Sequence, residues 1–155
     1  MTVSTADLWD ERGPELESLA LNFGDFGAKD LFSGPARTIR CFEDNALVKS
    51  TLSEPGDGAV LIVDGGGSIS TALMGDMIAE SAVSNGWSGV VINGAIRDRV
   101  AMKSMAIGVK ALASNPRKSS KAGAGEVDVT VEIGGATIRP GAMVFADPDG
   151  VVVEK

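Results

Sequence analysis

The chain contains no histidine and no tyrosine, and it has a single cysteine. Without histidine, Ser-His-Asp and Cys-His catalysis, histidine-ligated zinc and a histidine general base are excluded. One cysteine excludes an intrachain disulfide and a multi-cysteine metal site. Acid–base or metal chemistry must therefore come from Asp, Glu, Lys, bound water or water on a metal. Cys41 lies in the apolar-flanked RTIRCFEDN, and we expect a buried small hydrophobe rather than a nucleophile.

Long apolar segments and an excess of positive charge are also missing. No run of about 18 apolar residues occurs, so no membrane span is expected. The N-terminal MTVSTADLWDERG has no signal-peptide pattern, and we expect a cytoplasmic protein. The formal net charge of −7 argues against direct nucleic-acid binding, because that affinity depends mainly on Lys and Arg. This net charge is still compatible with a basic patch on part of the surface.

What the chain does have is a pattern of helices and strands over 155 residues, a length typical of one domain. Apolar runs at 59–63 and 89–94 predict buried strands, and Gly86 is expected to end the helix between them. We expect helices at 5–11, 44–52, 77–85 and, as one or two turns, 98–105. We expect strands at 35–42, 59–63, 89–94, 106–109, 127–133, 136–139, 143–146 and 151–153. Residues 1–155 are thus predicted to form one mixed α/β domain with helices around a sheet.

Three polar segments lie near the carboxyl ends of the predicted buried strands, where open α/β sheets bind ligands. The segment DGGG (64–67) is either a tight turn or a close approach to a ligand, and no complete nucleotide motif follows it. Gly75-Asp76 begins the central helix, where Asp76 is either the N-cap or a group facing a hydrated cation. Arg97-Asp98 follows the second buried strand. If the strands are neighbours, all three segments meet at one rim.

The chemistry available at such a rim is limited but definite. Asp98 is a hard oxygen ligand suited to Mg²⁺ or Mn²⁺, and magnesium takes only one or two protein carboxylates. Arg97 can hold a carboxylate or enolate oxygen with its planar fork. The helix N-terminus at 75–78 adds N–H donors. Together these groups would stabilise an enolate, as in retro-aldol cleavage or decarboxylation of an oxoacid.

The segment 114–125 carries the one basic cluster of the sequence, formed by Arg117, Lys118 and Lys121. It is either a solvated loop, a subunit contact or the rim through which a substrate enters. Three positive charges are too few to argue for RNA binding.

Several longer stretches resemble the RraA-like family. They are VDGGGS, LMGDMIAE, NGWSGVVINGAIRD, NPRKSSKAGAGE and PGAMVFADPDGVVV, and the resemblance extends from about Asp7 to Val153. This family includes regulators of ribonuclease E activity and 4-hydroxy-4-methyl-2-oxoglutarate aldolases. Its aldolase branch has the pattern D-x20-R-D, which Asp76 and Arg97-Asp98 match. Some members carry a methyltransferase name, but we find no convincing adenosylmethionine-binding glycine motif here.

The resemblance implies a role for each residue of this pattern. Gly75, Asp76, Met77 and Ile78 would bind substrate, Arg97 would bind the pyruvyl group, Asp98 would ligate a divalent metal, and Asp76 would orient a water on it. The implied reaction cleaves 4-hydroxy-4-methyl-2-oxoglutarate to two pyruvates, with oxaloacetate decarboxylation as a side activity. Longer aldolases add an acidic residue to the neighbouring site from a C-terminal extension. Because the sequence ends at Lys155, we expect decarboxylation to be retained better than aldol cleavage.

The resemblance also bears on architecture and partners. It implies a homotrimer with sites near subunit interfaces, and a fold like the phosphohistidine swivelling domain, with α/β/β/α layers. An alternative to the lyase is a non-catalytic regulator that binds and inhibits an RNase E-type ribonuclease through its acidic surface.

Overall fold

Two strands buried on both faces form the centre of the protein, β4 (Val60–Asp64) and β6 (Gly89–Ile96). The computed structural model describes residues 4–155. The other strands are β1 (Leu16–Ser18), β2 (Gly24–Asp25), β3 (Phe32–Arg40), β5 (Ala72–Met74), β7 (Gly108–Ser114), β8 (Glu126–Val127), β9 (Val131–Ile133), β10 (Ala136–Ile138), β11 (Met143–Asp147) and β12 (Gly150–Glu154). The helices are α1 (Thr5–Arg12), a 3-10 turn (Gly13–Glu15), α2 (Ala46–Leu52), α3 (Asp76–Ser84) and α4 (Arg99–Met102).

The main sheet is mixed, with strand order β1-β12-β11-β3-β4-β6-β7-β2. Strands β3, β4, β6 and β7 are parallel to one another, and β5 is parallel to β6. The long strand β3 joins the two halves of the sheet. Its residues 36–40 pair with β4, whereas its residues 32–35 pair antiparallel with β11. The predicted mixed α/β fold is therefore confirmed.

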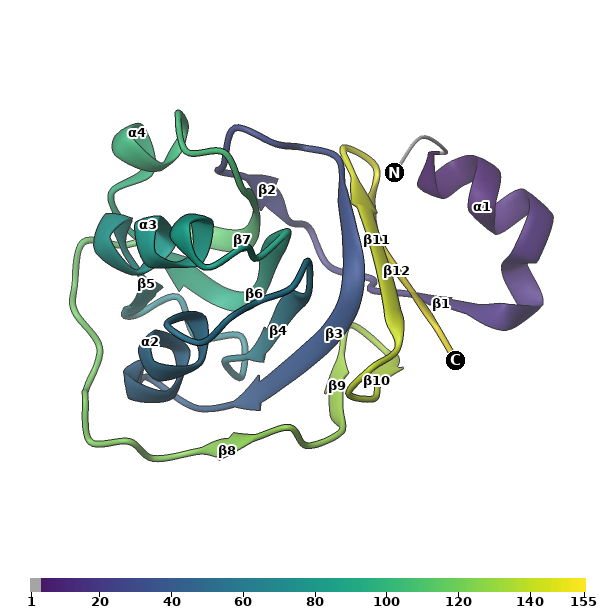
Figure 1. The fold of residues 1–155 in the computed structure, drawn as a ribbon. Coiled ribbons are helices and arrows are strands. Elements are labelled where there is room, and N and C mark those ends of the chain that lie inside the picture. The colour runs from purple at the N-terminus through teal and green to yellow at the C-terminus, as the bar shows by residue number, and fades with distance from the viewer. Residues whose placement is uncertain (1–3) are drawn as a thin grey trace.

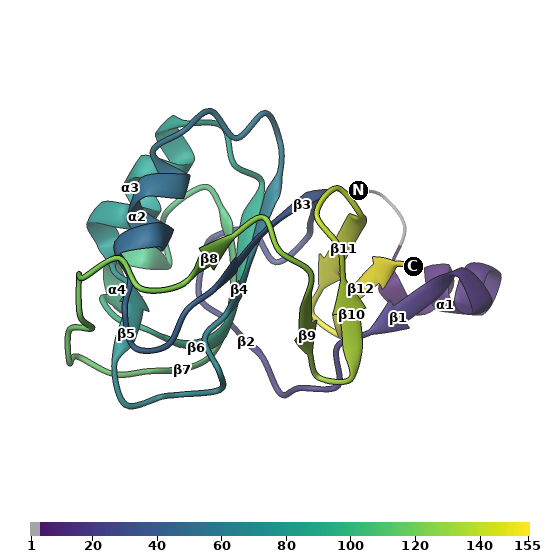
Figure 2. The same ribbon diagram turned by 90° about the horizontal axis from the view of Figure 1, so that it is seen from below.

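The two faces of the parallel strands bury different cores. Leu61 and Val63 face the helices, whereas Val60 and Ile62 face the β-rich part formed by the C-terminal third. Helices α2, α3 and α4 cover one face, and strands β9 to β12 lie on the other side (Figures 1 and 2). Helix α1 projects beyond this second layer (Figure 2). Because both faces are covered, the apolar runs of β4 and β6 need no polar alternation.

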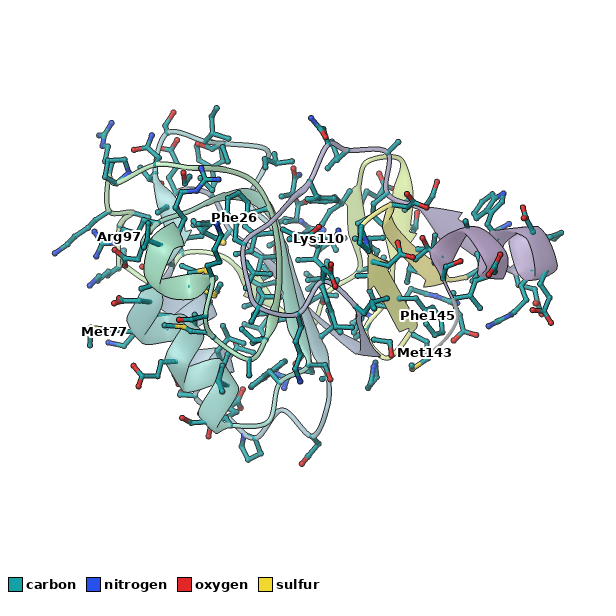
Figure 3. All side chains as sticks on the ribbon, turned by 90° about the horizontal axis from the view of Figure 1, so that it is seen from above. Phe26, Met77, Arg97, Lys110, Met143 and Phe145 are labelled. Carbon is teal, nitrogen blue, oxygen red and sulfur yellow. The ribbon has the colours of Figure 1, made fainter. Side chains whose placement is uncertain are left out.

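A buried lysine that the sequence analysis overlooked links the two halves. Lys110 on β7 is 1% exposed, and its Nζ lies 2.9 Å from Oδ1 of Asp25 on β2. The same Nζ donates a hydrogen bond to the main-chain oxygen of Asp147 on β11 at 2.6 Å. Figure 3 shows Lys110 in the interior, well away from Arg97 at the outer edge. A charge so deeply buried needs such partners.

Most predicted elements are present with shifted ends. Ser4 caps α1, because its Oγ accepts a hydrogen bond from the Asp7 N–H at 3.1 Å. The predicted strand at 127–133 is wrong, since Asp128 has a positive φ of 58° that separates β8 from β9. The short strands β1, β2 and β5 were not predicted. Within residues 4–155, no helix is long and apolar enough to cross a membrane.

Candidate active site

Parallel pairing of β5 with β6 brings the two ends of the D-x20-R-D pattern together. The Arg97 N–H donates to the Met74 carbonyl at 2.9 Å, which fixes the end of β6 beside the end of β5. Two residues after Met74 and one residue after Arg97, the Asp76 N–H donates to Oδ2 of Asp98 at 3.1 Å. The helix and strand between Asp76 and Arg97 thus form one crossover that returns to its starting point.

The start of α3 differs from one of the two expectations. Gly75, not Asp76, is the N-cap, and Asp76 is the first residue of the helix. Asp76 as the N-cap is therefore wrong. The N–H groups of Met77 and Ile78 have no acceptor among the described residues, as is usual in the first turn of a helix. These two donors remain for a ligand, whereas the N–H of Asp76 is used by Asp98.

Asp98 adopts a left-handed backbone conformation, with φ 58° and ψ 40°. Asp tolerates this region better than most residues, and such positions often mark functional sites. Asp98 is the N-cap of α4, but its side chain makes no capping hydrogen bond. Its Oδ2 accepts from Asp76, and no described residue donates a hydrogen bond to its Oδ1. One carboxylate oxygen is therefore open.

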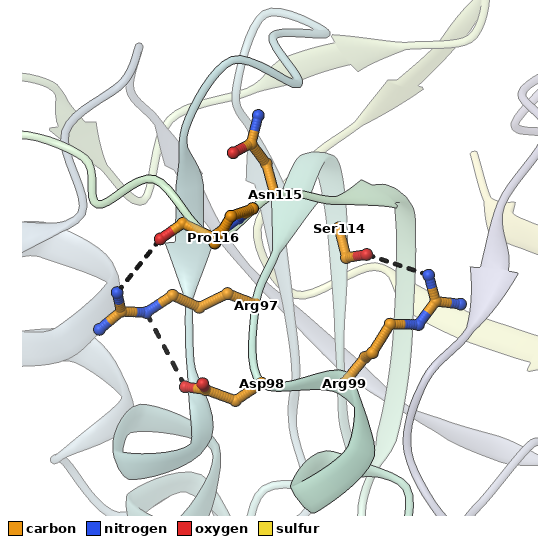
Figure 4. A pocket seen from close by; sticks show the side chains of 6 residues that line it. All are labelled: Arg97, Asp98, Arg99, Ser114, Asn115 and Pro116. Atoms are coloured by element: carbon orange, nitrogen blue, oxygen red, sulfur yellow. Dashed lines mark hydrogen bonds and ion pairs between the residues drawn. The ribbon is translucent and has the colours of Figure 1, made fainter.

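Arg97 and Asp98 lie between two cavities. The smaller, about 230 Å³, is lined by Arg97, Asp98, Arg99, Ser114, Asn115 and Pro116. In it, Nη1 of Arg97 donates to the Pro116 carbonyl at 3.4 Å, and Nη1 of Arg99 donates to Oγ of Ser114 at 3.0 Å. Figure 4 shows the two arginines pointing in opposite directions from the end of β6.

The larger cavity is a cleft of about 560 Å³ on the other side of Arg97 and Asp98. All four residues from Gly75 to Ile78 line it, together with Asn45, Ala46, Lys49, Ser50, Ser53, Ala72, Ser81, Arg97, Asp98, Lys118, Ser119 and Lys121. Its size is typical of a small-molecule site. The Arg97 and Asp98 side chains are 35% and 38% exposed, and Nε of Arg97 lies 3.8 Å from Oδ2 of Asp98. Neither group is neutralised by a close bidentate pair.

The DGGG segment does not join this cleft. Oδ1 of Asp64 accepts hydrogen bonds from the Gly66 N–H at 3.0 Å and from the Asn93 amide at 3.3 Å. Gly66 and Gly67 have positive φ values of 68° and 77°, which favour glycine. The segment is the tight turn that the sequence analysis kept as one alternative.

The residues present fit a divalent cation with few protein ligands. Within residues 4–155, no three His, Cys, Asp or Glu side chains group closely enough to hold a metal between them. The open Oδ1 of Asp98 is one hard ligand, and Asp76 places a second carboxylate on the same cleft. Mg²⁺ commonly binds through one or two carboxylates and keeps several waters.

The basic segment lies against the cleft because a buried aspartate holds it there. Asp44 is 3% exposed, and its carboxylate accepts from the Ala46 N–H at 3.1 Å, the Ala122 N–H at 2.9 Å and the Gly123 N–H at 3.1 Å. Burial alone would raise the pKa of Asp44, but these hydrogen bonds outweigh it and lower the pKa. Asp44 was not among the residues expected at the site. Nothing in the sequence indicates that Asp44 contacts the Gly-rich segment at 122–125, which lies nearly 80 residues further along the chain.

Cys41 is 5% exposed, in agreement with the expected buried hydrophobe. Burial raises its pKa to about 12, and the nearby carboxylates of Asp44 and Asp64 add to this effect. It does not line the cleft.

Fold and site together define a small mixed α/β protein with an arginine, two carboxylates and a helix N-terminus on one cleft. The chain belongs to the RraA-like family (Aldolase/RraA), which it matches over residues 5–153. It is similar to two solved structures at 47% identity and a TM-score of 0.96 each. One is described as an S-adenosylmethionine: 2-dimethylmenaquinone methyltransferase from Geobacillus kaustophilus HTA426, covering 98% of this chain and 94% of that one. The other is the RNA-processing inhibitor RraA from Thermus thermophilis, covering 99% and 93%.

A more distant structure belongs to the same group. RraAS2 from Streptomyces coelicolor, of the RNase ES inhibitor RraA protein family, is 28% identical with a TM-score of 0.79, covering 96% of this chain and 77% of that one. The family thus includes aldolases and inhibitors of RNA processing.

Proposed function

We propose that the protein is a divalent-metal-dependent carbon–carbon lyase that acts through the enolate of pyruvate. The reactions are decarboxylation of oxaloacetate and cleavage of 4-hydroxy-4-methyl-2-oxoglutarate to two pyruvates. The observation that carries this proposal is the meeting of Arg97, the open Oδ1 of Asp98 and the first turn of α3 on one cleft. These are the groups that an enolate beside a carboxylate requires.

Each residue has a distinct task in this reaction. Arg97 binds the carboxylate and the oxygen on C2 of the oxoacid, and the free N–H groups of Met77 and Ile78 bind the remaining carboxylate oxygen. Asp98 holds the cation, which supplies Lewis-acid polarisation of the 2-oxo group when bound. Asp76 orients water in the cleft for proton transfer.

The bond changes are the same in both reactions up to the enolate. The C3–C4 bond breaks and its electron pair forms the C2=C3 double bond of the enolate, while the π pair of the carbonyl moves onto the C2 oxygen, which Arg97 stabilises. From oxaloacetate the leaving group is CO₂. From the hydroxy-methyl substrate it is a second pyruvate, formed as the 4-hydroxyl gives its proton to the water that Asp76 orients. Protonation at C3 then gives pyruvate.

The direct test is pyruvate release from each substrate by purified protein, with Mg²⁺ and with EDTA, against a blank without protein. Activity with Mg²⁺ and its loss with EDTA are expected. Equal rates in both, or rates no higher than the blank, would contradict the lyase.

We also infer a homotrimer with this site near a subunit boundary. Met77 and Val100, on the first turns of α3 and α4, are 81% and 87% exposed, an arrangement that favours burial against a second subunit. Sedimentation equilibrium gives the mass, and a monomer would overturn this inference.

Regulation of an RNase E-type ribonuclease is the second candidate. The observation in its favour is the 47% identity with the RNA-processing inhibitor RraA over 99% of this chain. A pull-down with such a ribonuclease tests it. Binding that persists in the Arg97→Ala and Asp98→Asn variants would indicate a surface separate from the cleft, and the absence of binding would exclude this role.

A further inference from the structure

Three lysines line the larger cleft without a carboxylate partner. Lys49 comes from α2, and Lys118 and Lys121 come from the segment that Asp44 holds. Within residues 4–155, none of the three lies within 4.0 Å of a carboxylate oxygen, whereas Lys110 pairs with Asp25. Three cations without a carboxylate partner thus line one cleft in a chain whose net charge is −7.

The charges on the cleft give it a net positive character. Four cationic side chains line it, namely Arg97 and the three lysines, against two carboxylates, Asp76 and Asp98. The lining therefore has an excess of two positive charges, before any cation binds. A concave surface of one sign concentrates ligands of the opposite sign.

The segment that carries Lys118 and Lys121 is fixed to the cleft by main-chain hydrogen bonds at Arg117 and at Ser120. On one side, the Ala72 N–H on β5 donates to the Arg117 carbonyl at 2.8 Å, three residues before Gly75. On the other side, the Asn45 N–H donates to the Ser120 carbonyl at 2.9 Å, next to the hydrogen bonds of Asp44. Lys118 is thus tied to the strand that leads into the Arg97 site. Such anchoring lowers the entropy lost on binding a ligand.

Ser119 provides an independent sign that a polar ligand belongs here. It is 8% exposed and lines the cleft between the two lysines of the segment. Its Oγ has no hydrogen-bond partner among the described residues. Buried hydroxyl groups normally have a partner, so this donor lacks an acceptor that an anion in the cleft would supply.

We propose that Lys49, Lys118 and Lys121 form a subsite for the second carboxylate of a dicarboxylic 2-oxoacid. This inference rests on the proposed function, in which Arg97, the first turn of α3 and the cation on Asp98 take the first carboxylate and the oxo group. The three lysines then select dicarboxylic over monocarboxylic substrates, and the loop anchored by Asp44 is a specificity element. Ser119 adds a hydrogen bond to the same carboxylate.

The kinetic test compares two reactions that share the Arg97 site and differ in the second carboxylate. Oxaloacetate decarboxylation uses it, whereas exchange of the pyruvate methyl protons in D₂O, followed by NMR, does not. In Lys118→Met/Lys121→Met and in Lys49→Met, KM for oxaloacetate should rise by about ten- to hundredfold, with pyruvate exchange unchanged. Lys103→Met, an exposed lysine outside the cleft, is the matched control and should alter neither. Circular dichroism checks that each variant is folded.

Equal loss of both reactions in the lysine variants would overturn the proposal, because the lysines would then serve the common site. Calorimetric measurement of succinate, acetate and inorganic phosphate binding tests the lysine subsite independently of whether the protein has lyase activity. Succinate binding that exceeds acetate and phosphate binding, and that is lost in the double variant, supports the subsite even if no substrate is turned over. Succinate binding no tighter than that of acetate or phosphate, or unchanged in the double variant, would refute it.

Discussion

Gly75 and Asp98 approach so closely that a side chain at position 75 would displace the Asp98 carboxylate. A Cβ atom added to Gly75 would lie 2.7 Å from Oδ2 of Asp98 and 3.3 Å from Nε of Arg97. The backbone of Gly75 is extended, with φ −119°, so another residue could adopt it without strain. The glycine is therefore required by the neighbouring side chains rather than by its own conformation.

Gly75→Ala should lower kcat/KM by about tenfold or more with little change in Tm, because a misplacement near 1 Å is enough to impair catalysis. The measurement is oxaloacetate decarboxylation beside thermal unfolding. Gly13→Ala is the matched control, since its added Cβ would meet only Trp9, at 3.5 Å. An active Gly75→Ala variant would show that the close approach is not needed.

Asp98→Asn is the sharpest test of the metal ligand. Asn also tolerates the left-handed backbone of this residue, and its side-chain oxygen can still accept from Asp76, so the fold should persist. The loss of charge should reduce Mg²⁺-dependent activity by roughly a hundredfold or more. Titration of activity against Mg²⁺ shows whether affinity is lost, and unchanged activity would remove Asp98 from the role of ligand.

Arg97→Ala should lower kcat/KM by an amount that corresponds to a loss of about 2–4 kcal/mol of transition-state stabilisation, the range for removal of an oxyanion donor. Arg97→Lys should restore little of this, since an ammonium group does not reproduce the planar fork. The kcat/KM of Arg99→Ala, which removes an arginine that lines only the smaller cavity, is the comparison. Full rescue by lysine would mean that Arg97 acts only as a point charge.

Asp44 gives a prediction on pH. Its pKa in the folded protein lies below the unfolded value of about 3.9, so its stabilising effect is fully present above that value and is lost as the pH falls toward the folded pKa. Between pH 7 and pH 3, Tm should therefore fall less in Asp44→Asn than in the wild type. At pH 7 the variant should be less stable by about 1–3 kcal/mol. Asp10→Asn, exposed on α1, should behave as the wild type.

Cys41 should be inert in the folded protein. With its pKa raised to about 12, almost no thiolate forms at pH 8. Iodoacetamide should modify it only after unfolding in guanidinium, as mass spectrometry would show. Rapid modification of the folded protein would contradict the buried position.

The D-x20-R-D spacing was readable because the crossover it spans is local. The nine-residue helix α3, which begins at Asp76, and the buried strand β6 return the chain to the carboxyl edge of the sheet. Asp76 and Arg97 are therefore adjacent because β5 and β6 pair in parallel. By contrast, the sequence left open whether DGGG belonged to the site. The hydrogen bond between Asn93 and Asp64, which are 29 residues apart, fixes this segment as a turn outside the cleft.

The sequence alone determined the chemistry that is excluded and the strands that form the core. The lack of histidine is a fact of composition, and the uniform apolar runs of β4 and β6 require cover on both faces. The tertiary structure decided which side chains share the cleft. Asp44 and the loop at 122–124 are nearly 80 residues apart and meet because β8, which follows the loop, pairs with the end of β3, which precedes Asp44. No periodicity or motif encodes such a contact, which depends on the packing of the whole sheet.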